Sequence, residues 1–269
     1  MFPVYLGVTL DRTLSFREHC MKLKGKISTR NNILGKLANS IWGADAKTLK
    51  TTAIALCYST AEYCAPVWKN SRHTKKIDTE LNNSCRKITG TLRPTPIPLV
   101  YRLAEIAPPH IRREAKTKTQ KHKQEIDPRH TLYDHVPAQK RLKSRSSFMT
   151  TESLDPTETP YYIIEKWKEW DGSTRNGAVQ EPSDQLPNGH NLPRKDWVAL
   201  NRARTRVGRT ADNLKRWKIS EDNKCTCGAP QTMEHILRDC GQGPECSDAE
   251  LLACNDVARD WIRFYRDKI

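Results

Sequence analysis

Four residues near the end of the sequence have the types and the spacing of a metal site. Cys225 and Cys227 are separated by one residue, His235 follows after seven more and Cys240 after another four, which gives the pattern C-x-C-x7-H-x4-C. Three thiolates and one imidazole can complete a tetrahedral Zn²⁺ site, and four protein ligands leave no position open for a substrate. We therefore predict a structural zinc ion; four reduced side chains grouped by accident are the alternative.

The remaining cysteines form no second pattern of this kind. Cys57, Cys64 and Cys85 fall on apolar faces of predicted helices, where a thiol acts as a small hydrophobic group. Cys246 and Cys254 are less favoured as ligands than the four residues of the pattern. The sequence also has no Asp-Asp dipeptide, no glycine-rich phosphate loop and no Ser/His/Asp arrangement. No residue is therefore predicted to be catalytic.

Local signals indicate how the metal ligands are held. Residues 232–237 have the pattern of a short helix that presents His235 inward, with the last cysteine at its end. Ser247 and Glu250 fit a capping box, which opens a final helix. Trp261, on that final helix, is expected to pack against the metal-binding segment.

The charge of the chain is strongly positive and unevenly spread. The formal net charge is +15 over 269 residues. Residues 1–150 have 28 Lys and Arg against 11 Asp and Glu, and residues 191–220 have nine against two, whereas 151–190 and 221–269 are net acidic. Basic blocks of this kind favour a polyanionic partner, most often nucleic acid, and a merely solvated basic surface is the alternative.

Two other classes of protein are not favoured by the composition. No run of about 18 apolar residues is present, so no membrane span is predicted. The first residues, Met1 to Val4, lack the basic and apolar regions of a secretory signal. The nine cysteines are therefore expected to be reduced thiols or metal ligands in a protein that is not secreted. Of the two compartments expected, nuclear and cytoplasmic, the nucleus follows only from the family resemblance given below.

Apolar spacing and end signals predict a mainly helical chain. Residues 4–11 are rich in β-forming side chains and form a strand or short hairpin, with Gly7 allowing a bend. Ser15 and Glu18 fit a capping box that opens the first helix. Gly90 fits a helix C-cap. The helices are predicted at residues 16–41, 45–64, 75–88, 99–106 and 161–170.

These elements group into three consecutive parts. Residues 1–125 are predicted to form a helical bundle, and residues 194–269 a small zinc-stabilised helical module. Residues 126–193 contain repeated prolines and many Ser, Thr and Asn, so we predict a partly irregular linker. Basic side chains of the first helix could touch phosphates or simply face solvent: Lys22, Lys24, Lys26 and Arg30.

One long stretch carries a family likeness. Residues 58–63 read YSTAEY, 65–68 read APVW, 86–90 read RKITG and 92–96 read LRPTP, and PPHIRR follows at 108–113. This string resembles the thumb region of reverse transcriptases from non-LTR retrotransposons of the jockey type. Residues 4–11 read VYLGVTLD and look like the strand that follows the catalytic palm in the same proteins.

The end of the chain resembles the same family. LNRARTRVGR, at residues 200–209, is similar to the sequence upstream of the family's terminal zinc motif, and GAPQTMEHIL, at 228–237, is close to that motif itself. The family usually has glycine where Arg206 stands. Together the matches cover most of the chain.

The resemblance implies that the parent protein is an RNA-directed DNA polymerase. Residues 1–125 then contain the end of the polymerase domain and its thumb, and residues 194–269 the Arg-rich and CCHC zinc module. The palm, whose paired aspartates hold two Mg²⁺ ions, is missing from this sequence, so the chain alone is expected to be inactive. An upstream polymerase region is expected if the gene model is truncated. The rival reading is a stand-alone, non-catalytic, zinc-containing nucleic-acid-binding protein; a protein-interaction module is weaker.

The resemblance also suggests which side chains meet the partner, which would be RNA, DNA or an RNA–DNA hybrid. Tyr5, Leu6 and Gly7 match the strand that helps to hold the primer end. Clustered Arg and Lys can grip phosphates. The residues predicted to contact nucleic acid are Arg112, Arg113, Lys116, Lys118, Arg202, Arg204, Arg206 and Arg209.

Overall fold

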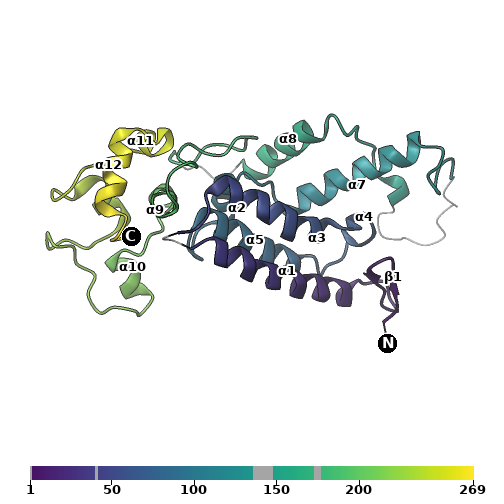
Figure 1. The fold of residues 1–269 in the computed structure, drawn as a ribbon, viewed down its shortest axis with the longest axis horizontal. Helices are drawn as coiled ribbons and strands as arrows, with labels where there is room; N and C mark the ends of the chain where they lie inside the picture. The colour runs from purple at the N-terminus through teal and green to yellow at the C-terminus, as the bar shows by residue number, and fades with distance from the viewer. Residues whose placement is uncertain (1, 40–41, 136–147, 173–176) are drawn as a thin grey trace. The chain divides into compact units, whose positions relative to one another are not determined.

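The structure, a computed structural model, is mainly helical with one short two-stranded hairpin (Figure 1). It describes residues 2–39, 42–135, 148–172 and 177–269. Parts of the predicted linker (136–147 and 173–176) and the predicted end of the first helix at Ile41 lie outside the described residues. In the part of the chain that is described, no helix combines the length and the apolar character needed to cross a bilayer.

Short helices, two π-helical turns and one hairpin follow one another along the described part of the chain. The strands are β1 (Val4–Tyr5) and β2 (Val8–Thr9), and the helices are α1 (Arg17–Leu37), α2 (Ala46–Ala53), α3 (Ser59–Glu62), α4 (Ala65–Trp68), α5 (Lys75–Thr89), α6 (Ile97–Ala104), α7 (Pro109–Ile126), α8 (Thr159–Asp171), α9 (Arg194–Thr205), α10 (Ala211–Arg216), α11 (Asp248–Ala253) and α12 (Asp256–Tyr265). The π-helical turns η1 (Ile54–Tyr58) and η3 (His235–Asp239) and the 3₁₀ turn η2 (Phe148–Thr150) complete the set.

The chain divides into two compact units, and three of the boundaries fall inside helices, in α1, in α5 and at the end of α8. Unit 1 comprises residues 1–31, 54–81 and 107–170, and unit 2 comprises residues 32–53, 82–106 and 171–269. This division differs from the three consecutive parts expected from the sequence. Residues 32–53 and 82–106 group with the C-terminal residues instead of with the rest of the predicted helical bundle.

Unit 1 begins with the β1–β2 hairpin. Val4 pairs with Thr9 and Tyr5 with Val8, so Leu6 and Gly7 form a two-residue turn. Both turn residues have positive φ, 44° and 81°, which is the backbone of a type I′ turn; glycine adopts it without the cost that a Cβ imposes. The predicted extended segment is therefore a hairpin, and its bend is at the predicted glycine.

The helices of unit 1 pack around Trp68, whose ring is fully buried. Its Nε1 donates to the carbonyl of Tyr63 at 3.0 Å. The His19 ring of α1 lies 5.7 Å away, and the Arg113 guanidinium of α7 lies 5.9 Å from the ring centre. Asn31 of α1 donates to the carbonyl of Glu80 in α5 at 2.8 Å, which joins these two helices.

Unit 2 is built where side chains of α9 meet the C-terminal end of α5. Arg194 donates to the carbonyls of Lys87 and Ile88 at 2.6 and 2.5 Å, and Trp197 Nε1 donates to the second of these at 3.1 Å. A helix ends with carbonyls that have no partner inside the helix, and a cation there also meets the negative end of the helix dipole. These contacts explain why the end of α5 groups with the C-terminal residues.

Gly90 permits this close approach. Its φ of 72° is left-handed, as the predicted helix C-cap requires. A Cβ built on it would lie 2.3 Å from Cγ2 of Val198 in α9. Any other residue would therefore push α9 away from the end of α5.

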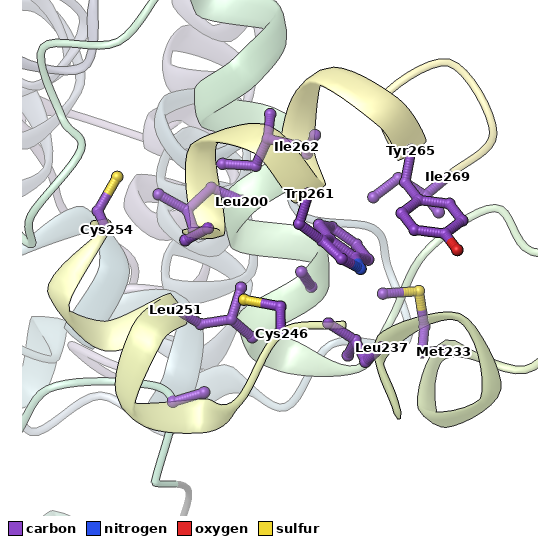
Figure 2. Packing of buried hydrophobic residues seen from close by; sticks show 14 of the residues in the cluster. Leu200, Met233, Leu237, Cys246, Leu251, Cys254, Trp261, Ile262, Tyr265 and Ile269 are labelled. Carbon is purple, nitrogen blue, oxygen red and sulfur yellow. The ribbon is translucent and has the colours of Figure 1, made fainter. Parts of the chain in front are cut away.

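The hydrophobic core of unit 2 centres on Trp261 of α12 (Figure 2). Leu200 of α9, Leu251 of α11 and Leu237 of η3 lie around its buried ring. The indole Nε1 donates to the carbonyl of Ile236 at 3.0 Å. The predicted packing of Trp261 against the segment that carries His235 is confirmed.

The two predicted capping boxes had different outcomes. Ser247 and Glu250 form the box at the start of α11, with both hydrogen bonds present. The box at Ser15 was wrong: the Asp11 carboxylate accepts from the Ser15 backbone N–H at 2.8 Å, and α1 begins later, at Arg17. In the predicted box the Glu18 carboxylate would accept from the Ser15 N–H, but Asp11, four residues upstream of Ser15, accepts that hydrogen bond instead. The predicted final helix is also broken, because Cys254 is left-handed between α11 and α12.

Candidate metal centre and basic surfaces

The four residues of the cysteine–histidine pattern converge in space. The potential ligand atoms of Cys225, Cys227, His235 and Cys240 all lie within 4.8 Å of one another. The sulfurs of Cys225 and Cys240 are 3.8 Å apart, and the sulfur of Cys227 is 3.2 Å from Nε2 of His235. Three of the four residues are buried and Cys227 is exposed. This cluster could bind a metal ion.

A tight turn places the first pair of sulfurs. The backbone of Lys224 pairs with that of Pro230, and the Cys225 N–H donates to the carbonyl of Ala229 at 2.7 Å. The Gly228 N–H donates back to the carbonyl of Cys225 at 2.8 Å, which closes the turn. This hydrogen-bonded turn brings both thiols within reach of the other two ligands.

A short helical segment places the second pair of ligands. Thr232 Oγ1 accepts from the backbone N–H of His235 at 3.1 Å, as an N-cap does. The segment then widens into the π-helical turn η3, and Cys240 follows immediately after it. The predicted helix is present, and its wider turn was not foreseen; such turns are frequent at functional sites.

The core of unit 2 anchors this second pair. The carbonyl of Ile236 accepts from Trp261, and the carbonyl of Leu237 accepts from the backbone of Cys246 at 2.8 Å. Met233 and Leu237, on either side of His235, belong to the same buried cluster (Figure 2). His235 is therefore held by packing on both sides.

The electrostatics of the cluster favour one thiolate. Burial alone would raise the pKa of Cys225, but hydrogen bonds from the Cys227 backbone and from His235 outweigh it and lower the pKa to about 6. A hydrogen bond from the Ala229 backbone would lower the pKa of Cys227, but loss of hydration and then the neighbouring Cys225, whose thiolate repels a second negative charge, outweigh it and raise the pKa. Metal ligation requires thiolates, and a bound cation removes this repulsion.

The other cysteines of unit 2 are not part of the cluster. Cys246 and Cys254 lie in the hydrophobic core, with exposed fractions of 2% and 3%. Burial raises the pKa of Cys246 to about 12. Among the described residues, the four-residue cluster is the one group of this kind, in agreement with the lower weight given to these two cysteines.

Two of the predicted nucleic-acid contacts on α7 share a buried carboxylate. Arg112 Nε donates to Glu62 at 2.5 Å, and Lys116 Nζ lies 2.8 Å from the other oxygen of that carboxylate. Burial would raise the pKa of Glu62, but the two cations outweigh it and lower the pKa. Arg112 also lies over the ring of Tyr58, 5.1 Å from its centre. Both cations therefore have a role inside unit 1.

The other two predicted contacts on α7 are also engaged. Arg113 donates from its two terminal nitrogens to the two oxygens of Asp78, at 2.6 and 2.9 Å, and its side chain is only 4% exposed. Lys118 pairs with Glu152 at 2.6 Å. None of the four predicted residues of α7 therefore presents an unpaired charge.

Two arginines of the predicted C-terminal cluster are engaged within unit 2 in the same way. Arg204 is buried and donates twice to the carbonyl of Leu251, at 3.0 and 2.8 Å, and burial lowers its pKa to about 10. Arg206 ends α9 in the left-handed conformation and pairs with Asp248 and Glu234. Arg206 thus stands next to two carboxylates and is occupied within unit 2.

Arg202 and Arg209 differ from these. Arg202 is partly buried and donates to the carbonyl of Ile269 at 2.8 Å. Arg209 is exposed. In the described residues, neither guanidinium pairs with an Asp or Glu side chain.

The predicted primer-grip residues lie in the hairpin of unit 1. Tyr5 and Leu6 are 69% and 72% exposed, and Gly7 is in the turn. The hydroxyl of Tyr63 donates to the carbonyl of Leu6 at 3.1 Å, which holds the turn. The two side chains are therefore available for contact.

A basic surface on unit 1 matches the sequence prediction only in part, since Lys22 and Lys26 of the first helix were considered as phosphate contacts and its other cations were not. It lies on the first half of α1, on the turn that precedes α5 and on the first residues of α5. None of its exposed cations has an ion-pair partner among the described residues. We call it the α1–α5 basic surface; it comprises Arg17, Lys22, Lys26, Arg72, Lys75 and Lys76.

His73 shows that these two segments converge. Loss of hydration has the largest effect and lowers the pKa of His73. The charges of Arg72, Lys76 and Arg17 lower this pKa further, and Asp11 acts in the opposite direction. Lys76 Nζ also lies 3.2 Å from the sulfur of Met21 in α1. The cationic character of these positions is visible in the sequence, but their lack of acidic partners is a property of the fold.

Comparisons with protein-family models, with curated proteins and with solved structures gave no match to this chain.

Proposed function

We propose that this chain binds nucleic acid through the α1–α5 basic surface of unit 1 and that a structural zinc ion stabilises unit 2. One observation carries the proposal: six exposed cations lie on two segments of unit 1, none forms an ion pair among the described residues, and three of them, Arg17, Arg72 and Lys76, act together on His73. An unpaired cation keeps its full attraction for a phosphate, whereas an ion-paired one must first give up its partner. Contacts of this kind give affinity and no sequence readout.

The chemistry of the cysteine–histidine cluster supports zinc. Two sulfurs bound at about 2.3 Å to a tetrahedral Zn²⁺ lie about 3.8 Å apart. The sulfurs of Cys225 and Cys240 have this separation, 3.8 Å. Soft thiolates with one imidazole select zinc over Mg²⁺ or Ca²⁺. The ion would hold the 225–230 turn against the core segment that carries His235.

A closed set of four ligands supports a binding role and not a catalytic one. A catalytic zinc keeps a position open for water or substrate. Phosphoryl transfer by two metals needs a carboxylate cluster, and the described residues contain no such group. The resemblance to jockey-type reverse transcriptases supports RNA, DNA or an RNA–DNA hybrid as the partner and, for the chain, a role in the binding part of an RNA-directed DNA polymerase.

Salt dependence tests the nucleic-acid part of the proposal. Fluorescence anisotropy of labelled single-stranded RNA, duplex DNA and a hybrid would be measured with the full chain between about 50 and about 200 mM KCl. We expect the logarithm of the affinity to fall with the logarithm of the salt concentration by about 0.7 to 0.9 per phosphate contact. No binding at the low-salt end, or a flat dependence, would rule out this function.

Metal analysis tests the zinc part. We expect one zinc per chain in wild type, and loss of the metal in Cys225→Ser and in His235→Ala. Cys64→Ser is the matched control, because Cys64 is a partly exposed thiol of unit 1 outside the cluster. Metal-free wild type, or equal metal content in all four proteins, would contradict the assignment.

A further inference from the structure

Unit 2 contains a cleft of about 630 Å³ whose lining is rich in cations. α9, the start of α10, Gln231 and the last residues of the chain form its walls. Its cationic lining residues are Lys195, Arg202, Arg209, Arg266 and Lys268, and its one acidic side chain is Asp267.

The carboxylates at the cleft neutralise only part of this charge. Lys195 pairs with Asp267, and Arg266 pairs with Asp196 at 2.7 Å. Arg202, Arg209 and Lys268 have no Asp or Glu partner among the described residues.

The two unpaired arginines are close enough to repel each other. Burial lowers the pKa of Arg202, and the charge of Arg209 lowers it further. Arg202 is held in place, since it donates to the carbonyls of Ile269 at 2.8 Å and of Gly90 at 3.4 Å. An anion between two guanidinium groups would relieve the repulsion and use donors that face the cleft.

The walls of the cleft are held before any ligand arrives. Gln231 Oε1 accepts from the Ala211 N–H at 2.8 Å, and the Gln231 N–H donates to the carbonyl of Asn223 at 2.7 Å. Lys268 is also restrained, with Nζ 4.4 Å from the ring centre of Phe264. A preformed site loses less conformational entropy on binding than a set of free surface lysines does.

We propose that this cleft binds a phosphate group of a nucleic-acid strand, with Arg202 and Arg209 as its two principal donors. That the phosphate belongs to a nucleic-acid strand rests on the proposed function. The cleft itself shares no residue with the α1–α5 basic surface. Lys268 supplies a third positive charge at the edge. The remaining arginines of the predicted cluster, Arg204 and Arg206, are excluded because they are occupied within unit 2.

The test compares Arg209→Gln with Arg263→Gln in the full zinc-loaded chain. Both remove one exposed arginine charge from unit 2, but Arg263 of α12 does not line the cleft and pairs with Asp260. We expect Arg209→Gln to weaken single-stranded RNA binding by roughly threefold to tenfold and to make the salt slope shallower by about 0.7. Arg263→Gln should match wild type.

A second arm uses inorganic phosphate alone. Phosphate should shift the NMR resonances of the Nε–H groups of Arg202 and Arg209 and leave that of Arg263 unchanged. If RNA binds wild type but both variants match it, the cleft assignment is wrong and the proposed function stands. If phosphate shifts the two resonances but no nucleic-acid strand binds, the cleft binds a small anion, and the claim that the phosphate belongs to a strand is wrong. If neither ligand binds, both proposals fail.

Discussion

Two basic helices of unit 1, α7 and α1, differ in what their cations touch. The predicted contacts of α7 meet carboxylates: Arg112 and Lys116 share Glu62, and Arg113 grips Asp78 with two hydrogen bonds. The exposed cations of α1 have no such partner among the described residues. The density of Lys and Arg in a sequence therefore measures total charge, and the fold decides how much of that charge is available to a ligand.

The arginines of one helix of unit 2, α9, also differ in what they contact. Arg194 and Arg204 of α9 are buried and serve backbone carbonyls, whereas Arg202 borders a cleft. A buried guanidinium with several carbonyl acceptors stabilises the fold, whereas the partly buried Arg202, which lines the cleft beside Arg209, is the one proposed to bind an anion. Arginines in the same run of sequence thus have opposite roles, which substitutions can separate.

Arg204→Ala should have the largest effect on stability. The substitution leaves the carbonyl of Leu251 without its charged donor and opens a cavity, so we expect a loss of about 3 kcal/mol in the free energy of opening of unit 2. Hydrogen exchange of the amides of unit 2 measures it. Arg259→Ala, an exposed residue of α12, is the control, and an equal effect there would show that Arg204 is not structural.

Asp78→Asn should rank second. The guanidinium of Arg113 would remain buried without a charged partner, which we expect to lower the stability of unit 1 by about 2 kcal/mol. Arg113→Met with Asp78→Leu removes both charges and should recover part of the loss. If the double variant is no more stable than Asp78→Asn, the pair is not the cause.

Acid sensitivity should be smaller and specific to Glu62. Its pKa is lowered in the folded protein, so its contribution to stability is present above its ordinary pKa of 4.5 and is lost as the pH falls through the lowered value. We expect the stability difference between wild type and Glu62→Gln to be on the order of 1 kcal/mol at pH 7 and to shrink below about pH 4.5. Urea unfolding across this range measures it; a difference that does not depend on pH would contradict the pairing.

Local signals predicted much of this fold, and long-range contacts explain what they missed. The Ser247–Glu250 box, the glycine C-cap at Gly90 and the inward placement of His235 depend on neighbours in the sequence. The grouping of α5 with α9 depends on Arg194, more than 100 residues away from the carbonyls that it binds. No periodicity or spacing encodes such a partner.

The same distinction holds for the sites. The metal cluster could be predicted because its four ligands come from 16 consecutive residues, whose turn and helix are local. The basic surfaces could not be ranked from the sequence, because the carboxylates that neutralise α7 come from Glu62, Asp78 and Glu152. Those acceptors lie 34 to 54 positions from the cations.

The most direct test compares two double variants with the same change of charge, Lys22→Gln/Lys26→Gln on α1 and Lys116→Gln/Lys118→Gln on α7. Binding of single-stranded RNA would be measured against salt for both and for wild type, after hydrogen exchange has shown that each variant is folded. If the exposed cations carry the binding, the α1 variant should make the salt slope shallower by about 1.4 and the α7 variant should leave it unchanged. The reverse result, a loss confined to the α7 variant, would contradict the account.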